Sequence, residues 1–375
     1  MIIGIPKEIK NHEYRVGMVP DSVREVTSNG HQVIVETLAG SGIGFSDDDY
    51  IAAGASILPT ATEIFAQAEM IVKVKEPQAI ERAMLREGQI LFTYLHLAPD
   101  FPQTEQLINS KATCIAYETV TDRLNQLPLL APMSEVAGRM SIQAGAQALE
   151  KSNGGRGLLL GGVPGVEPAK VVVIGGGVVG SNAARMAVGM RADVTILDRN
   201  INTLRTLDEE FQGRAKVVYS TEEALNRHVL DADLVIGAVL IPGAAAPKLV
   251  TKRHIKSMKP GAAIVDVAID QGGCFETSHA TTHADPIYIV DDVVHYCVAN
   301  MPGAVARTST YALNNATLPY ILQLANKGVK AALTDDAGFL NGLNVIQGMV
   351  TCKEVAENFN LEYVEPAKAI EIALQ

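Results

Sequence analysis

The chain has few cysteines, and none of them lies close to another. Cys114, Cys274, Cys297 and Cys352 are the only four in 375 residues. They form neither a CxxC metal motif nor a redox pair, so the sequence does not predict a cysteine-based metal or dithiol centre. Free thiols of this kind fit a reducing compartment. We therefore expect a cytoplasmic protein.

Long apolar runs are also missing. No uninterrupted apolar stretch reaches about 18 residues, the length that a membrane-spanning helix requires. The first ten residues, MIIGIPKEIK, are typical of a short strand followed by a charged loop. They contain no basic segment followed by a long apolar segment, so we expect no secretory signal.

Basic charge is in short supply. The chain has 31 lysines and arginines against 42 acidic residues, which gives a formal net charge of −11. A general nucleic-acid partner needs a basic surface to neutralise phosphates, so this balance argues against one, although a local basic pocket for a small anion remains open. Apolar residues make up 47% of the chain and charged residues 19%, which argues against disorder. At roughly 100–200 residues per domain, the length predicts two domains.

The first third of the chain alternates strand and helix patterns, which predicts a parallel α/β sheet. The predicted strands are Ile2–Ile5, Gln32–Glu36, Met70–Val74, Ile90–Thr93 and Thr113–Ala116. The predicted helices are Ser22–Asn29, Asp47–Ala53, Ala61–Ala68 and Pro102–Ser110.

A second α/β series begins near Pro168. Its short apolar runs are bounded by Gly, Asp or Pro, as expected for strands buried on both faces. Six strands in this order suit a doubly wound nucleotide-binding domain. The predicted strands are Lys170–Ile174, Asp193–Leu197, Lys216–Tyr219, Leu234–Gly237, Ala263–Val267 and Ile287–Val290.

A helical stretch, Pro132–Ser152, joins the two series and is followed by the glycine-rich loop Gly154–Gly165. From Thr308 onward the pattern is mostly helical again. Two long connecting helices would return the C-terminus to the first domain, although a separate C-terminal cap is an alternative. We therefore expect two doubly wound α/β domains, with a nucleotide-binding domain at 129–305 inserted into a discontinuous domain formed by 1–128 and 306–375.

Gly175, Gly177 and Gly180 form the pattern GxGxxG directly after the apolar run Val171–Ile174. In a dinucleotide-binding unit the first glycine permits a tight turn, the second lets the backbone approach the pyrophosphate, and the third lets the helix pack on the strand. The N-terminus of that helix then presents N–H groups and a positive dipole end to the phosphates.

Asp198 closes the next predicted strand, 18 residues after Gly180. A carboxylate there accepts hydrogen bonds from ribose hydroxyls and repels a 2′-phosphate. The alternative is a glycine-rich turn with Asp198 as an ordinary helix cap, and the neighbouring Arg199 could hold a 2′-phosphate. We expect a preference for NAD(H) over NADP(H).

Three candidates for substrate chemistry follow strands of the first domain. Arg15 can bind a carboxylate through two parallel hydrogen bonds. Lys75 ends the run Met70–Lys75, in which strand alternation would place Lys73 and Lys75 on one face. His96 carries an imidazole, the side chain most often used for acid–base catalysis. Each residue also has an alternative when it is taken singly. Arg15 could form a surface ion pair with Glu8 or Glu13. Lys75 could be a solvated charge at the sheet edge, and His96 could be a structural histidine.

In the second domain, Asp270 follows a predicted strand, where ligands bind in open α/β sheets, and could orient water or ammonia. Its alternative is a turn-forming aspartate before Gly272. His279 and His283 are four residues apart, but no nearby thiol or carboxylate completes a metal set, so we expect no metal. Neither a GxSxG motif nor a Walker loop is present.

Several segments together resemble bacterial alanine dehydrogenases over nearly the whole chain, and more distantly the soluble part of the nicotinamide nucleotide transhydrogenase α subunit. The matching segments are Gly4–Glu8 with Arg15-Val16, Ile71–Pro77, Tyr94–Ala98, Ala131–Arg139, the glycine loop, Asp266–Cys274, His295–Gly303 and Thr308–Tyr320. Thr203 and His279 depart from the pattern expected of the family.

The resemblance implies NAD-dependent, reversible oxidative deamination of L-alanine to pyruvate and ammonia. By position, Arg15 and Lys75 would bind the substrate, and His96 and Asp270 would be the catalytic pair. The family is typically a cytoplasmic homohexamer. Beyond Gly175, Gly177 and Gly180, the residues implied to contact NAD are Ser134, Val178, Asp198, Ser220, Val239, Leu240, Val267, Ala268, Ile269, Asp270, Val298, Ala299, Asn300 and Met301. Open alternatives are a transhydrogenase-type hydride carrier, a saccharopine-type dehydrogenase and a non-catalytic NAD sensor.

Overall fold

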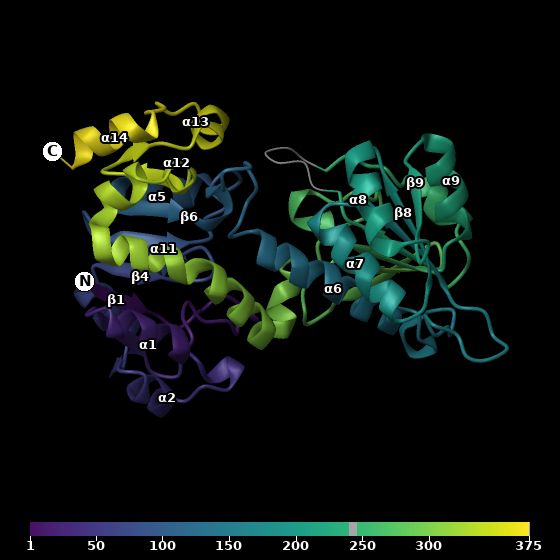
Figure 1. Ribbon diagram of the computed structural model, residues 1–375, viewed down its shortest axis with the longest axis horizontal. Helices are drawn as coiled ribbons and strands as arrows, with labels where there is room; N and C mark the ends of the chain where they lie inside the picture. Colours follow the sequence, from purple (N-terminus) through teal and green to yellow (C-terminus); the bar gives the residue numbers. More distant parts are fainter. Residues whose placement is uncertain (240–245, 375) are drawn as a thin grey trace. The chain divides into compact units, whose positions relative to one another are not determined.

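The chain folds into two compact units, as a computed structural model describes them for residues 1–239 and 246–374. The first unit combines Met1–Met133 with Val305–Gln375, and the second is Ser134–Ala304. In Figure 1 the yellow C-terminal segment accordingly lies in the same unit as the purple N-terminus. The domain limits expected from the sequence were 128/129 and 305/306.

The described part of the first unit is built on an eight-stranded sheet with the order β15-β14-β6-β5-β4-β1-β2-β3. Strands β1 to β6 run parallel, whereas β14 and β15 are antiparallel at one edge. The strands are β1 (Ile2–Ile5), β2 (Gln32–Glu36), β3 (Ser56–Leu58), β4 (Met70–Val72), β5 (Ile90–Thr93), β6 (Thr113–Ala116), β14 (Leu343–Ile346) and β15 (Met349–Val350).

All five predicted strands of this unit are confirmed, although β4 ends two residues earlier than expected. Strand β3 and the antiparallel pair β14 and β15 were not predicted, whereas the expectation of a mostly helical C-terminal stretch is confirmed by α11 to α14, within 306–373. These strands have two to four residues each, too short to show a periodicity. Asn344 also interrupts the apolar run of β14, and its side-chain amide donates to Thr119 Oγ1 at 2.8 Å.

The second unit's described residues contain a seven-stranded sheet with the order β12-β13-β11-β10-β7-β8-β9. Alternate residues of its central strand β7 pack into two different apolar clusters: Val171 and Val173 into one, Val172 and Ile174 into the other. Burial on both faces explains the continuous apolar run that the sequence shows. The strands are β7 (Lys170–Ile174), β8 (Asp193–Asp198), β9 (Lys216–Tyr219), β10 (Leu234–Gly237), β11 (Ala263–Asp266), β12 (Ile287–Val290) and β13 (Val293–Tyr296).

One edge of this sheet differs from expectation. Ile287–Val290 was predicted as the sixth strand of the series, but it is an antiparallel edge strand paired with β13. The sixth parallel strand is β13, which pairs with β11 and was not predicted. Asp291 and Asp292 both have positive φ values, 47° and 60°, as a two-residue hairpin turn requires. The fold class, two parallel-dominated doubly wound α/β domains, is otherwise confirmed.

The four predicted helices of the first unit are confirmed to within two residues at each end. The connecting helix α6 is Ala131–Ala148, and the long helix α11 is Ala306–Thr334, with non-helical geometry at Gly328. Among the described residues, no helix is both long and apolar enough to span a membrane. The remaining helices are α1 (Pro20–Ser28), α2 (Asp47–Ala52), α3 (Ala61–Gln67), α4 (Ala79–Arg82), α5 (Phe101–Ser110), α7 (Val178–Gly189), α8 (Ile201–Phe211), α9 (Glu222–Asp231), α10 (Lys252–Ser257), α12 (Ala337–Leu340), α13 (Lys353–Phe359) and α14 (Pro366–Ala373).

Candidate active site

Four neighbouring strands of the first sheet, β1, β4, β5 and β6, are each followed by charged or titratable residues. Glu8 and Arg15 follow β1, Lys75 follows β4, His96 follows β5 and Glu118 follows β6. Because the strands are parallel, their carboxyl ends share one edge of the sheet, which is where open α/β sheets bind ligands. The structure therefore brings the three substrate-side candidates to one edge.

Arg15 is buried, and its guanidinium group is held by Glu13. Nε donates to Glu13 Oε1 and Nη2 to Glu13 Oε2, both at 2.6 Å, while Nη1 contacts Met133 Sδ at 3.2 Å. Burial opposes the charged form, but the hydrogen bonds and charge of Glu13 outweigh it and raise the pKa of Arg15. The pair with Glu13 is thus an internal one rather than a surface ion pair, and it fixes the plane of a permanent cation.

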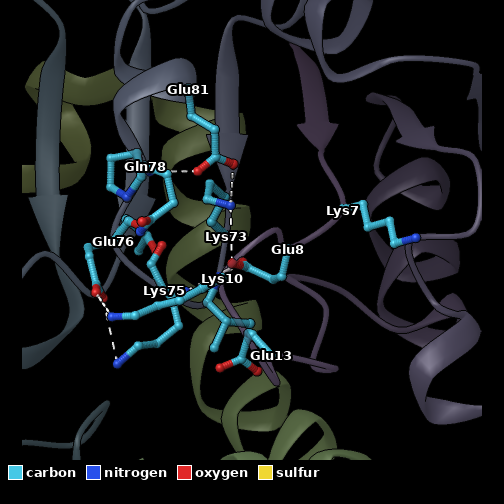
Figure 2. A network of polar contacts seen from close by, with 12 residues as sticks. Lys7, Glu8, Lys10, Glu13, Lys73, Lys75, Glu76, Gln78 and Glu81 are labelled. Carbon is cyan, nitrogen blue, oxygen red and sulfur yellow. Dashed lines mark hydrogen bonds and ion pairs between the residues drawn. The ribbon is translucent and has the colours of Figure 1, made fainter.

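Lys75 lies beside Glu76, with Nζ 3.6 Å from Glu76 Oε2 and only 13% of the Lys75 side chain exposed. Lys10 pairs with the other oxygen of the same carboxylate, as Figure 2 shows. Burial favours the neutral form of Glu76, but Lys75 and Lys10 outweigh it and lower the pKa of Glu76. A solvated edge charge does not describe Lys75, because its ammonium group is largely covered and paired.

Lys73 and Lys75 were expected on one face of a strand, but neither lies in β4, and the two lysines pair with different carboxylates. Strand β4 ends at Val72, and strand alternation therefore does not extend to Lys73. Lys73 is fully buried, with Nζ 3.1 Å from Glu8 Oε2 and 2.6 Å from Glu81 Oε1. Burial disfavours the ammonium, but the two carboxylates outweigh it and raise the pKa of Lys73.

His96 is half exposed and stands in the left-handed backbone region, with φ of 49°. Glu118 holds this backbone: Oε1 accepts the His96 N–H at 2.6 Å and the Leu95 N–H at 3.1 Å. Glu118 Oε1 also lies 4.0 Å from His96 Nδ1. A non-glycine residue in this region carries backbone strain, and such strain clusters at functional sites.

Tyr94 connects the environments of the candidates. Its ring is parallel to the His96 ring, with centroids 5.8 Å apart, and it lies near enough to Arg15 for the two to interact electrostatically. Its N–H donates to Val74 O at 3.3 Å, in the segment that leads to Lys75. Tyr94 is buried, which raises its pKa well above the usual range, so its hydroxyl stays protonated and donates to Leu129 O.

In the second unit, the glycine loop joins β7 to α7. Gly175 has φ of +98°, and a Cβ there would lie 2.7 Å from Ala238 O. A Cβ at Gly180 would lie 1.8 Å from Gly175 O, so the helix packs on the loop with no room for a side chain. Among the described atoms, nothing lies within 4 Å of a Cβ placed on Gly177, which begins α7 together with Val178.

Asp198 ends β8 and faces the glycine loop. Its Oδ2 accepts the Gly176 N–H at 2.6 Å, and its Oδ1 accepts the Asn200 N–H at 2.7 Å. Asn200, and not Asp198, caps α8, so the interpretation of Asp198 as an ordinary helix cap is wrong. Arg199 Nε donates to the backbone carbonyl of Ser220 at 3.4 Å, which places both residues beside the end of β9.

Asp270 lies exposed in the short 3-10 helix Val267–Gln271, directly after β11. This helix also holds Ala268, which is half-buried, and Ile269, which is buried. The buried Asp266 precedes it and closes the loop behind it, accepting the Ser278 hydroxyl at 2.6 Å and the Cys274 N–H at 3.0 Å. Burial raises the pKa of Asp266 despite these hydrogen bonds.

The segment 298–301 follows β13. Val298 and Met301 are buried, and Ala299 N donates to Thr281 O at 3.1 Å. Asn300 has φ of 64°, and its carbonyl lies 3.0 Å from His283 Nε2. The segment is therefore tied to the loop that carries the two spaced histidines.

Three further residues were expected to contact the cofactor, and the structure describes two of them. Ser134 is half-buried on the first turns of α6, and Val239 is half-buried after β10, with Cγ2 3.2 Å from a Cβ placed on Gly175. Leu240 lies outside the described residues. Within the described part of the chain, no group of three or more His, Cys, Asp and Glu side chains could hold a metal ion.

The residues of the second unit fit a nicotinamide dinucleotide. The space over Gly177 is open among the described atoms, and the first turn of α7 carries no side-chain cap, so its N–H groups suit a pyrophosphate. Asp198 stands at the end of the neighbouring strand, where a carboxylate meets the adenosine ribose.

The sequence did not select the residues that support the sites of the two units, although it offered Glu13 as a possible surface partner of Arg15. Glu13, Tyr94, Glu118 and Asp266 each contact or brace a predicted site residue or its loop. Glu118 and Asp266 stand at or just after strand ends, so the rule that selected His96 and Asp270 could also have selected them. Glu13 is two residues from Arg15, but nothing in the sequence indicates that this pair is buried.

Comparison with known proteins agrees with this geometry. The family model described as "Alanine dehydrogenase/PNT, N-terminal domain" matches residues 4–137, and its C-terminal counterpart matches residues 141–353. The chain is 62% identical over 370 residues to an alanine dehydrogenase of Halomonas elongata, covering 99% of this chain and 100% of that protein. It is 53% identical over 370 residues to an alanine dehydrogenase of Mycobacterium tuberculosis, with the same coverage.

Solved structures give the same result. An L-alanine dehydrogenase structure matches with a TM-score of 0.93 at 52% identity, covering 96% of this chain and 99% of that one. A transhydrogenase from Sinorhizobium meliloti matches with a TM-score of 0.83 at 25% identity, covering 94% and 100%. The resemblance seen in the sequence is thus confirmed, and this chain belongs to the alanine dehydrogenase/PNT family.

Proposed function

We propose that this protein is an NAD-dependent L-alanine dehydrogenase, an oxidoreductase that acts on a CH–NH2 group. It would catalyse the reversible oxidative deamination of L-alanine to pyruvate and ammonia. The observation that carries the proposal is the grouping of Arg15, Lys75 and His96 at one sheet edge, in a chain so similar to proteins named alanine dehydrogenase.

Two cations of the first unit suit a small 2-oxo acid. Arg15 is assigned to the substrate carboxylate, because Glu13 fixes its guanidinium plane and planar guanidinium groups bind carboxylates in two-point fashion. Lys75 is assigned to the carbonyl oxygen, where an ammonium group stabilises the charge that develops on oxygen. Binding would draw Lys75 away from Glu76, which can keep Lys10 as its partner.

His96 and Asp270 are assigned to proton transfer and to the orientation of water. Glu118 Oε1 lies 4.0 Å from His96 Nδ1, and the other ring nitrogen, Nε2, is assigned to exchange protons with the substrate. Asp270, exposed on its short helix, would orient the water that attacks the imine carbon, and His96 would pass the proton as ammonia leaves. Each role places a titratable group where the reaction moves a proton.

The second unit is assigned to the cofactor, which when bound accepts hydride from the α-carbon of alanine. Gly175, Gly177, Val178 and Gly180 would form the pyrophosphate cradle, and Asp198 would bind the adenosine ribose and disfavour a 2′-phosphate. The remaining proposed contacts are Ser134, Ser220, Val239, Leu240, Val267, Ala268, Ile269, Asp270, Val298, Ala299, Asn300 and Met301.

We further propose that the protein works in the cytoplasm as a homohexamer, with L-alanine, pyruvate and ammonium as small-molecule partners and without nucleic acid or membrane. The family resemblance supports the hexamer, and the net charge of −11 argues against a nucleic-acid partner.

One assay separates this function from its alternatives. NADH oxidation is followed with pyruvate plus ammonium, with 2-oxoglutarate plus lysine, and without either pair. We expect turnover only in the assay with pyruvate plus ammonium. We also expect the turnover to be faster with NADH than with NADPH. Turnover with the lysine pair would instead indicate a saccharopine-type enzyme, and NADH binding without turnover a carrier or sensor.

A further inference from the structure

Three buried charged residues, Glu8, Lys73 and Glu81, form one connected group beside Lys75. Their exposed fractions are 6%, 1% and 1%. Figure 2 shows the Lys73 ammonium group between the two carboxylates, 3.1 Å from Glu8 Oε2 and 2.6 Å from Glu81 Oε1. We call these three residues the buried triad.

The carboxylates of the buried triad hold both ends of the segment 74–78. Glu8 Oε1 accepts the N–H of Val74 at 2.7 Å and that of Lys75 at 3.4 Å. Glu81 Oε2 accepts the N–H of Gln78 at 2.7 Å. Lys75 therefore sits in a segment whose first and last N–H groups are fixed by carboxylates that share one cation.

Neighbouring strands fix the carbonyl groups of the same chain segment. Thr93 Oγ1 donates to Lys75 O at 3.0 Å, and Tyr117 Oη donates to Lys73 O at 3.0 Å. The backbone around Lys75 is thus held on its N–H side by the buried triad and on its C=O side by Thr93 of β5 and by Tyr117, which directly follows β6. Little freedom remains for the Cα position of Lys75.

We propose that Glu8 is a positioning residue for Lys75, acting through the buried triad. The proposal rests on the substrate-binding role of Lys75 given above. Burying two carboxylates and an ammonium group costs desolvation free energy, so the triad is a poor device for stability alone. Its hydrogen bonds go to the backbone of the one segment that carries Lys75, and misplacing a substrate-positioning group by about 1 Å can cost about 100-fold in activity.

The test is a double-mutant cycle between Glu8 and Lys75. Glu8→Ala is expected to lower kcat/KM for pyruvate by about 10- to 100-fold when Lys75 is present, because Lys75 would be misplaced. In a Lys75→Met background the same change is expected to cost less than about 3-fold, because the group being positioned is gone. Glu8→Gln, which keeps an oxygen for the Val74 N–H, is expected to recover most of the activity, and KM for NADH should not change.

A matched control is Asp47→Asn. Asp47 also closes a loop of the first unit, accepting the Leu38 N–H at 2.8 Å and the Thr37 hydroxyl at 2.6 Å, but it does not contact the segment 74–78. We expect its kcat/KM for pyruvate to stay near that of the wild type. If Glu8→Ala does not fold, Glu81→Gln enters the same cycle. Equal losses with and without Lys75, or no loss in either background, would overturn the proposal.

Hydrogen exchange gives a readout that does not depend on the proposed reaction. In Glu8→Ala the amides of Val74 and Lys75 should exchange at least about 10-fold faster, while those of β5 stay unchanged. Unchanged exchange at both amides would overturn the positioning role even in an active enzyme. A wild-type protein that does not turn over pyruvate would contradict the proposed function and leave this exchange result standing.

Discussion

The candidate site of the first unit consists mainly of side chains, whereas that of the second unit consists mainly of backbone groups. In the first unit, buried or half-buried charged side chains come from loops after four strands, and each is held by another side chain, as Arg15 is by Glu13. In the second unit, backbone dominates: a loop with three glycines and the start of α7, with Asp198 as the one charge directly bonded to that loop among the described residues. The side-chain site combines partners that are close in the sequence, such as Arg15 with Glu13, and partners that are distant, such as His96 with Glu118, whereas the backbone site depends on a short local motif.

We expect the largest effect on activity from a substitution in the side-chain site of the first unit. His96→Ala should lower kcat by about 100-fold or more, the usual loss when an acid–base group is removed. The Kd for NADH should not change, because the proposed cofactor residues lie in the other unit. Steady-state kinetics and fluorescence titration of NADH measure the two quantities, and near-wild-type turnover would remove His96 from the mechanism.

Next comes the backbone site, where two glycines can be compared. Gly180→Ala places a Cβ 1.8 Å from Gly175 O and should cost about 1–3 kcal/mol in the free energy of unfolding. It should also raise the Kd for NADH about tenfold or more, because the cradle must shift. Gly177→Ala meets no described atom within 4 Å, so it should leave the unfolding free energy nearly unchanged and weaken NADH binding only. Equal destabilisation by both changes would contradict this distinction.

We expect a smaller effect, on the preference for NADH over NADPH, when the carboxylate of Asp198 is removed. Asp198→Ala should reduce the ratio of kcat/KM for NADH to that for NADPH by about 10-fold, equivalent to the loss of one hydrogen bond to a charged group. Arg199 can then meet a 2′-phosphate without an adjacent carboxylate. Kinetics with both cofactors give the ratio, and an unchanged value would argue against the ribose role of Asp198.

The smallest effect concerns Glu76. Lys75 and Lys10 lower its pKa below the ordinary value of 4.5, so its ionised form stabilises the fold. That stability is present above pH 4.5 and is lost as the pH falls through the lowered pKa. Glu76→Gln should therefore cost about 1 kcal/mol of unfolding free energy at neutral pH and less in acid. Urea unfolding of both proteins at several pH values tests this, and a cost that does not fall in acid would contradict it.

The same contrast explains how much the sequence could predict. The glycine loop and Asp198 were placed correctly at the turn and strand end, because that motif is local. Arg15, Lys75 and His96 were identified by their positions after strands, and the structure brings them to one edge. Glu13 was considered only as a surface partner of Arg15, and Glu118 was not identified, because its contact with the His96 backbone depends on which strands lie side by side. Asp270 was also identified by its position after a strand, whereas the role assigned to 298–301 came from family resemblance alone, and both roles remain predictions.

The errors in the fold have a similar origin. Lys73 was placed beside Lys75 by strand alternation, but the strand ends at Val72. The hairpin at Asp291 and Asp292 reverses the chain and makes Ile287–Val290 an antiparallel edge strand. A short apolar run shows that a strand exists, but it does not show the strand's direction, which the turn decides.

The most direct test of the central claim is a crystal structure of the protein with NAD(H) and pyruvate bound. We expect the pyruvate carboxylate within hydrogen-bond distance of Arg15, its carbonyl oxygen near Lys75, and His96 Nε2 within reach of the reacting carbon's substituents. We also expect the adenosine ribose on Asp198. Pyruvate bound without contact to Arg15, Lys75 and His96 would contradict the account.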